Sequence, residues 1–377
     1  MSDNAYAPDK ILAHPETLKV LREGGHPYPL HLHLILSDLC NLDCGGCSYR
    51  MSGYPSSELF IDPKAAIPRN PNRMLETPLV ESVLRDCAAM GTCAIEFTGG
   101  GEPTVHPDCS HLLDYAQNLD LDTALITNGI LLPKIGAPAV RTQWLRISLD
   151  AATPETYARV RPGFGSVNHF ERACKGVRWA VEERWSRGTE WGDTTDCTIG
   201  VGFVVQAENH HEIVDAAALA YALGADNIRI SGLFTPRGDE YHAPFRKVAE
   251  RRAVEVVAQF DGAPIDGRPP FRVFNRYGEK LSDLAAPPDY SRCSYQRVTT
   301  YLGADANLYR CCVTSYSKHG LLGNVRDAAG FKALWDRAST RAELECFDAR
   351  SCERCQHNDK NRAINQAITP ITHPFFV

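Results

Sequence analysis

The chain has 377 residues, with 40 Lys and Arg against 46 Asp and Glu, and a formal net charge of −6. This length predicts two domains or one large barrel with an appendage, and a 44% hydrophobic content excludes a largely disordered or collagen-like chain. The sequence has no apolar run long enough to span a membrane, and its polar first residues do not resemble a secretory signal. We therefore expect a cytoplasmic protein, and the weakly acidic balance argues against nucleic acid as its main partner.

The predicted elements alternate between strand and helix from about residue 30 to about residue 260. The expected strands are 31–36, 94–97, 123–126, 144–149, 198–205 and 227–231. The expected helices are 78–90, 111–119, 170–185, 211–223 and a segment within 241–260. This alternation predicts an α/β fold with a parallel sheet and right-handed crossovers. Such a sheet closes partly or fully into a barrel whose chemistry lies at the carboxyl ends of the strands.

Two segments interrupt this pattern. The proline-rich segment 52–78 predicts a long loop over the site, and segment 261–292, rich in Pro, Gly and Asp, predicts a linker. After it, two short strand-like runs flank residues 303–306, which is typical of a hairpin. We therefore expect an N-terminal extension (1–29), a core domain (30–260), the linker (261–292) and a small C-terminal domain (293–377). This last domain is too small to be stable without a cross-link such as a bound metal.

Cysteine is the most informative residue, because 14 are present and disulfides are rare in reducing compartments. Nine of them fall into two groups, which points to metal or redox chemistry. The first group is Cys40, Cys44 and Cys47, and the second is Cys293, Cys311, Cys312, Cys346, Cys352 and Cys355. The other five are interpreted as small core residues.

The first group has the spacing C-x3-C-x2-C directly after a predicted strand. The same spacing also fits one face of a helix, but the intervening Asn, Asp and Gly residues favour a loop. Three thiolates on a short loop would hold three irons of a 4Fe–4S cluster and leave the fourth iron open. A zinc site completed by His31 or His33 is the alternative.

This loop resembles the one that defines the radical S-adenosylmethionine (SAM) superfamily. Residues 99–103, Gly-Gly-Gly-Glu-Pro, follow the second strand, where that family carries its Gly-Gly-Glu motif. The resemblance implies a partial (β/α)6 TIM-like barrel that holds a 4Fe–4S cluster and SAM. In the family, the reduced cluster cleaves SAM to a 5′-deoxyadenosyl radical, which abstracts a substrate hydrogen. An external electron donor, such as flavodoxin or ferredoxin, is also implied.

The resemblance extends to further strand ends, and it implies contacts with SAM for one set of residues. In that set the glycines approach the methionine end, Glu102 accepts from the ammonium group, Ser148 and Asp150 contact the ribose, Arg161 contacts the carboxylate, and Val204 packs on the adenine. The implied set is Gly100, Gly101, Glu102, Asn128, Ser148, Asp150, Arg161 and Val204. The residue before the third cysteine is usually aromatic in the family but is Gly46 here, and Tyr49 is the candidate substitute.

The second cysteine group, together with the predicted hairpin, resembles a twitch domain, which is a shortened SPASM domain with one auxiliary 4Fe–4S cluster. The resemblance implies the ligands Cys293, Cys311, Cys352 and Cys355. Cys312 is an alternative to Cys311, because adjacent residues of a strand point in opposite directions, and Cys346 is left over. A structural zinc ribbon would staple a small domain equally well.

The sequence says less about the substrate. Candidates for substrate contact or proton transfer end or follow the sixth strand, with a solvated charged loop as the other interpretation. They are Arg229, Arg237, Asp239, Glu240 and Tyr241. Because only 30 residues precede the first predicted strand, we expect a small polar substrate (a sugar, cyclitol, amino acid or nucleoside) and an oxidoreductase or an epimerase or mutase. The alternatives are a peptide-modifying or nucleobase-modifying radical SAM enzyme and a non-catalytic iron–sulfur electron carrier.

Overall fold

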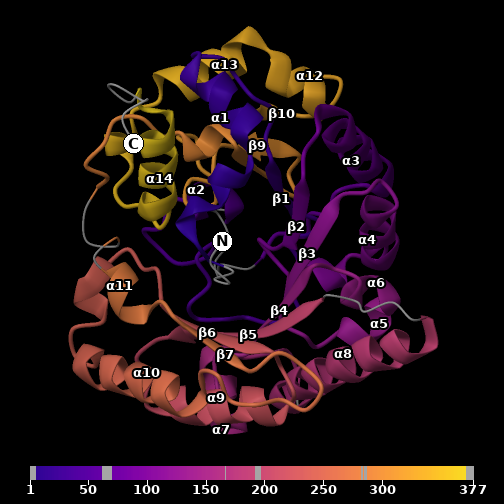
Figure 1. Ribbon diagram of the computed structural model, residues 1–377, viewed down its shortest axis with the longest axis vertical. Coiled ribbons are helices and arrows are strands. Elements are labelled where there is room, and N and C mark those ends of the chain that lie inside the picture. The colour runs from indigo at the N-terminus through magenta and orange to yellow at the C-terminus, as the bar shows by residue number, and fades with distance from the viewer. Residues whose placement is uncertain are drawn as a thin grey trace, which may run out of the picture.

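The computed structural model describes residues 6–61, 70–165, 167–191, 197–281, 283 and 287–370. In these residues ten strands form one sheet, in the order β10-β9-β8-β1-β2-β3-β4-β5-β6-β7 (Figure 1). The strands are β1 (His31–Ile35), β2 (Ala94–Thr98), β3 (Asp122–Thr127), β4 (Trp144–Ser148), β5 (Thr198–Val205), β6 (Asn227–Gly232), β7 (Arg272–Asn275), β8 (Thr299–Leu302), β9 (Asn307–Tyr309) and β10 (Leu321–Asn324).

Strands β1 to β7 are parallel and neighbour one another in chain order, which is the pattern of a barrel wound by successive β/α units. Strands β7 and β10 lie at the two ends of the sheet, so the barrel stays open. The expected α/β partial barrel is thus confirmed, and all six expected core strands form. A seventh, β7, lies inside segment 261–292, where we expected only a linker.

Helices cover the outer side of the sheet, as Figure 1 shows for α3, α4, α8, α9 and α10. The helices are α1 (Pro15–Arg22), α2 (Ser57–Phe60), α3 (Thr77–Met90), α4 (Cys109–Gln117), α5 (Leu132–Ile135), α6 (Ala137–Val140), α7 (Pro154–Val160), α8 (His169–Trp191), α9 (Ile213–Ala222), α10 (Arg246–Phe260), α11 (Tyr277–Leu281), α12 (Phe331–Asp336), α13 (Ala338–Cys346) and α14 (Asn358–Ile368). In the loop expected at 52–78, residues 57–60 form α2, and residues 62–69 lie outside the described residues.

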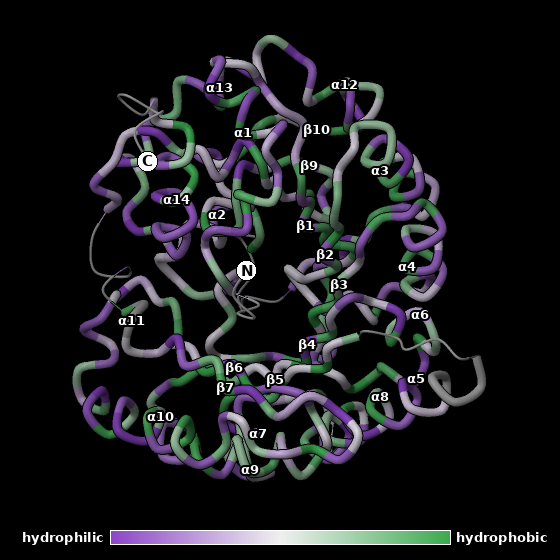
Figure 2. Tube along the Cα trace, viewed as in Figure 1, coloured by the Kyte–Doolittle hydropathy of each residue, from purple (hydrophilic) through white to green (hydrophobic). Residues whose placement is uncertain are grey.

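The core lies between the sheet and these helices. In α3, Val80, Val83, Leu84 and Cys87 have the spacing of one helix face and are fully buried. Figure 2 shows the matching alternation of hydrophobic and hydrophilic segments along α8 and α10. Along each strand alternate side chains point away from this core, so they face the inside of the barrel.

The expected C-terminal hairpin forms, because β8 and β9 are antiparallel neighbours. Strand β8 also pairs in parallel with β1, with His31 opposite Thr299 and Leu34 opposite Leu302. The C-terminal segment therefore continues the barrel sheet beyond β1. No helix in the described part of the chain combines the length and the apolar character needed to cross a membrane.

Candidate active site and second cysteine cluster

A cavity of about 290 Å³ opens at the carboxyl ends of the barrel strands. It brings together the first cysteine group and every residue for which the resemblance implied a SAM contact. These lining residues are Cys40, Cys44, Cys47, Gly100, Gly101, Glu102, Asn128, Ser148, Asp150, Arg161 and Val204. They come from the ends of β1 to β5 and from the end of α7, so one cavity joins segments up to 164 positions apart in sequence (Cys40 to Val204).

The cysteine loop turns tightly after β1. The backbone NH of Cys47 donates to the carbonyl of Cys44 at 3.2 Å, and the NH of Leu42 donates to Sγ of Cys40 at 3.4 Å. Burial raises the pKa of the Cys44 thiol to about 11, although the charge of Arg161 acts in the opposite direction. Buried thiols of this kind become thiolates when a metal centre supplies positive charge, which fits the donor set of an iron–sulfur cluster.

The glycine turn after β2 packs directly against the cysteine loop. The NH of Gly101 donates to the carbonyl of Ser37 at 3.0 Å, and the NH of Glu102 donates to that of Leu39 at 3.0 Å. A Cβ atom on Gly101 would lie 2.2 Å from the Leu39 carbonyl oxygen. Glycine is therefore required at this position by the backbone that carries the cysteines.

The carboxylate of Glu102 is fixed by four hydrogen bonds within the protein. It accepts from the NH (3.2 Å) and the hydroxyl (2.6 Å) of Thr104, from the hydroxyl of Thr127 (2.5 Å) and from the NH of Asn128 (2.8 Å). Burial raises the pKa of Glu102, and these hydrogen bonds limit the rise. Glu102 thus fastens the end of β2 to the end of β3 at the wall of the cavity.

Asp150 and Arg161 form an ion pair rather than standing apart. Nε of Arg161 donates to Oδ2 of Asp150 at 2.7 Å, and Oδ1 of Asp150 accepts from the NH of Val204 at 2.7 Å. The same guanidinium donates from Nη1 to Sγ of Cys44 at 3.7 Å. Asp150 has a φ of 56°, a strained value for a non-glycine residue that these contacts hold in place.

The position of Gly46 is explained by residues that sequence reasoning missed. A Cβ atom on Gly46 would lie 3.0 Å from Cδ1 of Leu233 and 3.1 Å from Oε1 of Gln206, and both residues line the cavity. Their side chains therefore fill the place of the aromatic residue that the family usually carries. Tyr49 also lines the cavity, and its hydroxyl is 3.0 Å from that of Tyr301. The only signal in the sequence was the departure at Gly46 itself.

A second contact that sequence reasoning missed links the cysteine loop to the C-terminal segment. The hydroxyl of Tyr316 donates to Oδ1 of the buried Asp38 at 2.5 Å, and Nε of Arg73 donates to Oδ2 of Asp38 at 2.7 Å. Asp38 lies two residues before Cys40, so the C-terminal segment helps to fix the start of the loop. Nothing in the local sequence around Asp38 predicts this partner.

The residues expected to contact the substrate are not brought together. Arg229 lies within β6 and faces the inside of the barrel. The other four belong to the turn after β6 and are absent from the lining of the cavity; they are Arg237, Asp239, Glu240 and Tyr241. The Tyr241 hydroxyl accepts from the NH of Ala207 at 3.1 Å. Arg237 and Glu240 are exposed and Asp239 and Tyr241 are half-buried, so substrate contact by this turn stays a prediction.

The second cysteine group converges on a separate cavity in the C-terminal segment. Its lining includes all four expected ligands, Cys293, Cys311, Cys352 and Cys355. Burial and the neighbouring sulfur of Cys311 raise the pKa of Cys293 to about 11. Donors of this kind fit a metal cluster that compensates their charge.

Cys312 is absent from the lining of this cavity. Its Sγ lies 3.1 Å from Nε2 of His357 and accepts from Nε2 of Gln356 at 2.7 Å. Cys346 is exposed at the end of α13. The geometry therefore favours Cys311 over Cys312 as the fourth sulfur of the group.

A single zinc ion and an iron–sulfur cluster require different spacings of their sulfur ligands. Four thiolates around one zinc lie about 3.8 Å apart, given a Zn–S bond of about 2.3 Å. Among the described residues, the group of three ligand atoms within 4.8 Å of one another is His31, His33 and Glu96, and it contains no cysteine. Neither cysteine group thus has three ligand atoms gathered this closely in the described residues, and a 4Fe–4S cluster, in which each sulfur binds a different iron, needs no such close set.

Comparisons with known proteins agree with this geometry. The family model described as the radical SAM superfamily matches residues 34–220. The chain is 27% identical over 351 residues to mycofactocin maturase MftC of Mycolicibacterium smegmatis, which covers 90% of this chain and 79% of the relative. It is 28% identical over 206 residues to the PqqA peptide cyclase of Gluconobacter oxydans, which covers 54% of this chain and 49% of the relative.

Solved structures show the same fold. Streptococcus suis SuiB bound to precursor peptide SuiA matches with a TM-score of 0.55 at 13% identity, over 92% of this chain and 72% of that chain. The superfamily binds a 4Fe–4S cluster and SAM, and the residues around the cavity at the strand ends suit both. The family match, the open barrel and the cysteine loop held by the glycine turn lead to one conclusion: this chain belongs to the radical SAM superfamily.

Proposed function

We propose that this protein is a radical SAM enzyme that modifies a peptide. The observation that carries the proposal is the single cavity in which the three early cysteines meet the ends of β2 to β5. When bound there, the cluster and SAM supply a 5′-deoxyadenosyl radical that removes a hydrogen atom from the substrate. A non-catalytic electron carrier would have no use for the part of this cavity that extends from the cysteines along the ends of β2 to β5.

The peptide substrate is supported by the relatives. MftC is named a maturase, and the Gluconobacter enzyme is named a peptide cyclase. The first of these aligns with most of this chain. A small polar substrate, which we expected from the short segment before β1, has less support than this alternative.

The chain's own residues supply binding and orientation. Cys40, Cys44 and Cys47 would hold three irons. The backbone at Gly100 and Gly101 would approach the methionine end of SAM, because neither residue has a side chain in the way. Val204 and Leu233 would form the apolar wall for the adenine, and the cavity walls would keep water from the reacting atoms.

The second cysteine cavity supports a redox role. Four cysteines would ligate every iron of an auxiliary cluster, which leaves no iron free to bind substrate. We infer that this cluster carries electrons and that the net reaction is an oxidation of the peptide, with a flavodoxin-type or ferredoxin-type donor reducing the first cluster. The peptide and the donor stay predictions.

The test is an anaerobic reaction of the iron-loaded protein with dithionite, SAM and the short peptide encoded nearest to its gene. We expect 5′-deoxyadenosine and a peptide that has lost two hydrogens by mass. A protein with Cys40, Cys44 and Cys47 all changed to Ala should yield neither product. Release of 5′-deoxyadenosine only with sugars or nucleosides would refute the peptide substrate, and no release under any condition would refute the enzyme.

A further inference from the structure

The floor of the barrel, directly below the SAM cavity, is strongly polar. Glu96 and Arg146 each precede by two residues a cavity-lining residue of the same strand, Thr98 and Ser148 respectively. Because alternate residues of a strand face the same side, these side chains point into the barrel one layer below the cavity. Arg229 of β6 belongs to the same inner face, and its charge acts on Arg146 and Glu96.

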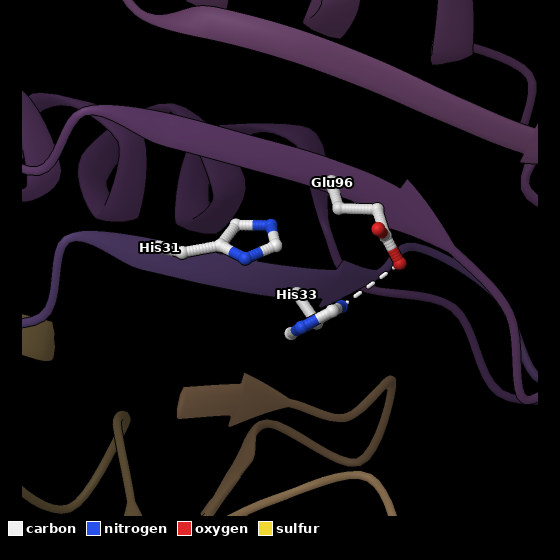
Figure 3. A group of neighbouring side chains, drawn as sticks. All are labelled: His31, His33 and Glu96. Carbon is white, nitrogen blue, oxygen red and sulfur yellow. Dashed lines mark hydrogen bonds and ion pairs between the residues drawn. The ribbon is translucent and has the colours of Figure 1, made fainter. Parts of the chain in front are cut away.

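Three floor residues form a compact group that Figure 3 shows in detail. His31 and His33 project from β1, and Glu96 projects from the neighbouring β2 toward them. Nδ1 of His33 lies 2.9 Å from Oε1 of Glu96, and the two imidazole rings are 4.2 Å apart. Taken alone, two imidazoles and a carboxylate within 4.8 Å would suit a divalent cation.

The surrounding charges argue against a cation. Glu96 is the one carboxylate of this group, and the permanent charges of Arg146, Arg229 and Lys360 all act on it. Burial and the charge of Arg146 lower the pKa of Arg229 to about 10. Each added positive charge would worsen this repulsion, whereas an anion would relieve it.

In the described part of the chain the two guanidiniums have no acidic partner. Among the described residues, no carboxylate oxygen lies within 4.0 Å of Arg146 or Arg229. Each of the two side chains is half-buried. Both arginines donate hydrogen bonds to the phenol oxygen of Tyr6. Burial alone would raise the pKa of Tyr6, but the charges of the two arginines and these hydrogen bonds lower it.

A glycine lies on the strand between these two arginines. Gly202 of β5 is paired with Ser148 on β4 and with Arg229 on β6. A Cβ atom at position 202 would meet nothing closer than Cδ of Arg146, at 3.6 Å. This is an ordinary van der Waals distance, so packing does not require glycine here, and β5 places no side chain on the inner face at the level of Arg229.

We propose that Arg146 and Arg229 bind a carboxylate of the peptide substrate on the barrel floor and so present the peptide to the SAM cavity above. The proposal rests on the proposed peptide function. Two guanidiniums suit a carboxylate because each offers paired N–H donors, and the bonds are strengthened by the charges. The Glu96–His33 pair is then the internal counter-charge of the floor, rather than a metal site.

The test uses the anaerobic, iron-loaded protein with SAM and four synthetic pools of random decapeptides. The pools contain or lack Asp and Glu, and each has either a free or an amidated C-terminus. We expect the protein to retain peptides with a carboxylate about 10-fold better than the pool that has none, and the pool that is retained identifies a side-chain or a C-terminal carboxylate. Arg229→Gln and Arg146→Gln should remove this preference, and Gly202→Val should weaken it by crowding the side chain of Arg146.

Arg178→Gln, on the exposed surface of α8, is the matched control and should keep the preference. Iron content and circular dichroism establish that each variant is folded, and Arg229→Lys should restore part of the preference. Equal retention of all four pools, or an unchanged preference in both arginine variants, would overturn the proposal.

A second probe separates this proposal from the proposed function. Glutarate should raise the melting temperature of the wild type but not that of Arg229→Gln. Neutral glutaramide should leave the melting temperature of both proteins unchanged. If glutarate behaves so while no peptide pool is retained, the carboxylate site stands and the peptide function fails. If peptides are retained without regard to carboxylates and glutarate has no effect, the peptide function stands and the carboxylate site fails.

Discussion

Arg161 donates a hydrogen bond from Nη1 to Sγ of Cys44 at 3.7 Å, so a permanently charged guanidinium lies beside a cysteine of the first group. The same side chain is paired with Asp150 through Nε at 2.7 Å. This one residue therefore connects the cysteine loop after β1 to the ends of β4 and β5, since Asp150 also binds the NH of Val204. Three walls of the cavity depend on its position.

Arg161→Gln should lower SAM-dependent formation of 5′-deoxyadenosine by about 10-fold to 100-fold, because it removes the charge and leaves Asp150 buried without its partner. Arg161→Lys should recover only part of the loss, since an ammonium group cannot reach both partners. Arg159→Gln, on the exposed side of α7, serves as the control and should keep wild-type rates. Equal rates in Arg161→Gln and wild type would exclude this role.

Gly46→Phe introduces the aromatic side chain usual in the family into space that is already filled. Because a Cβ atom at position 46 lies 3.0 Å from Leu233, we expect weaker SAM binding, measured by equilibrium dialysis, by about 10-fold or more. The double variant Gly46→Phe with Leu233→Ala should regain much of the affinity, since the second change vacates the space. A single variant that binds SAM normally would show that Leu233 does not fill this place.

The second cysteine group should be separable from the first by iron content. Cys352→Ser should reduce the iron bound by the anaerobically loaded protein from about eight to about four atoms per chain. Cys346→Ser and Cys312→Ser should keep the full amount, because Cys346 is exposed and Cys312 points to His357 and Gln356. Loss of iron in Cys312→Ser would instead make Cys312 the ligand, and zinc in place of iron would restore the zinc-ribbon alternative.

Because of His26, the free energy of unfolding of the protein should be lower in mild acid than at neutral pH. Burial and the charge of Arg297 lower the pKa of His26 from 6.5 to about 4, and neither ring nitrogen has a hydrogen-bond partner among the described residues. Between pH 6.5 and about pH 4, the unfolded chain binds a proton at this imidazole, whereas the folded protein keeps the ring neutral. The stability due to the neutral ring is thus complete above pH 6.5 and is lost as the pH falls toward 4.

His26→Phe keeps a ring that can stack on Trp335, which lies 5.2 Å from His26 in the wild type. Between pH 7 and pH 5, its free energy of unfolding should fall by about 1 kcal/mol less than that of the wild type, allowing for the partial exposure of His26. Urea denaturation under argon, followed by Trp fluorescence, measures this difference. Parallel curves for the two proteins over this range would contradict the assignment.

Local patterns in the sequence were enough to predict the strand order and the cysteine loop. The alternation of strands and helices gave β1 to β6 within a few residues of their bounds, because an amphipathic period and a buried strand are both local features. The short β7 was missed, since a strand of four residues in a Pro-rich and Gly-rich segment carries too weak a pattern. The candidate SAM residues came from the resemblance to the radical SAM family, and they line one cavity because a parallel sheet brings all its carboxyl strand ends to one edge.

The sequence by itself determined which strand ends meet and that the first three cysteines share one loop, since both follow from residue spacing along the chain; the four cysteines of the second group came from the resemblance to a twitch domain. Only the tertiary structure decided that Arg161 turns to Asp150 and Cys44, that Leu233 fills the space over Gly46, and that β8 extends the sheet beyond β1. It alone also placed Arg146 and Arg229 in the same interior. These relationships join segments far apart in the chain, and their geometry depends on strand register and close packing, which no local pattern encodes.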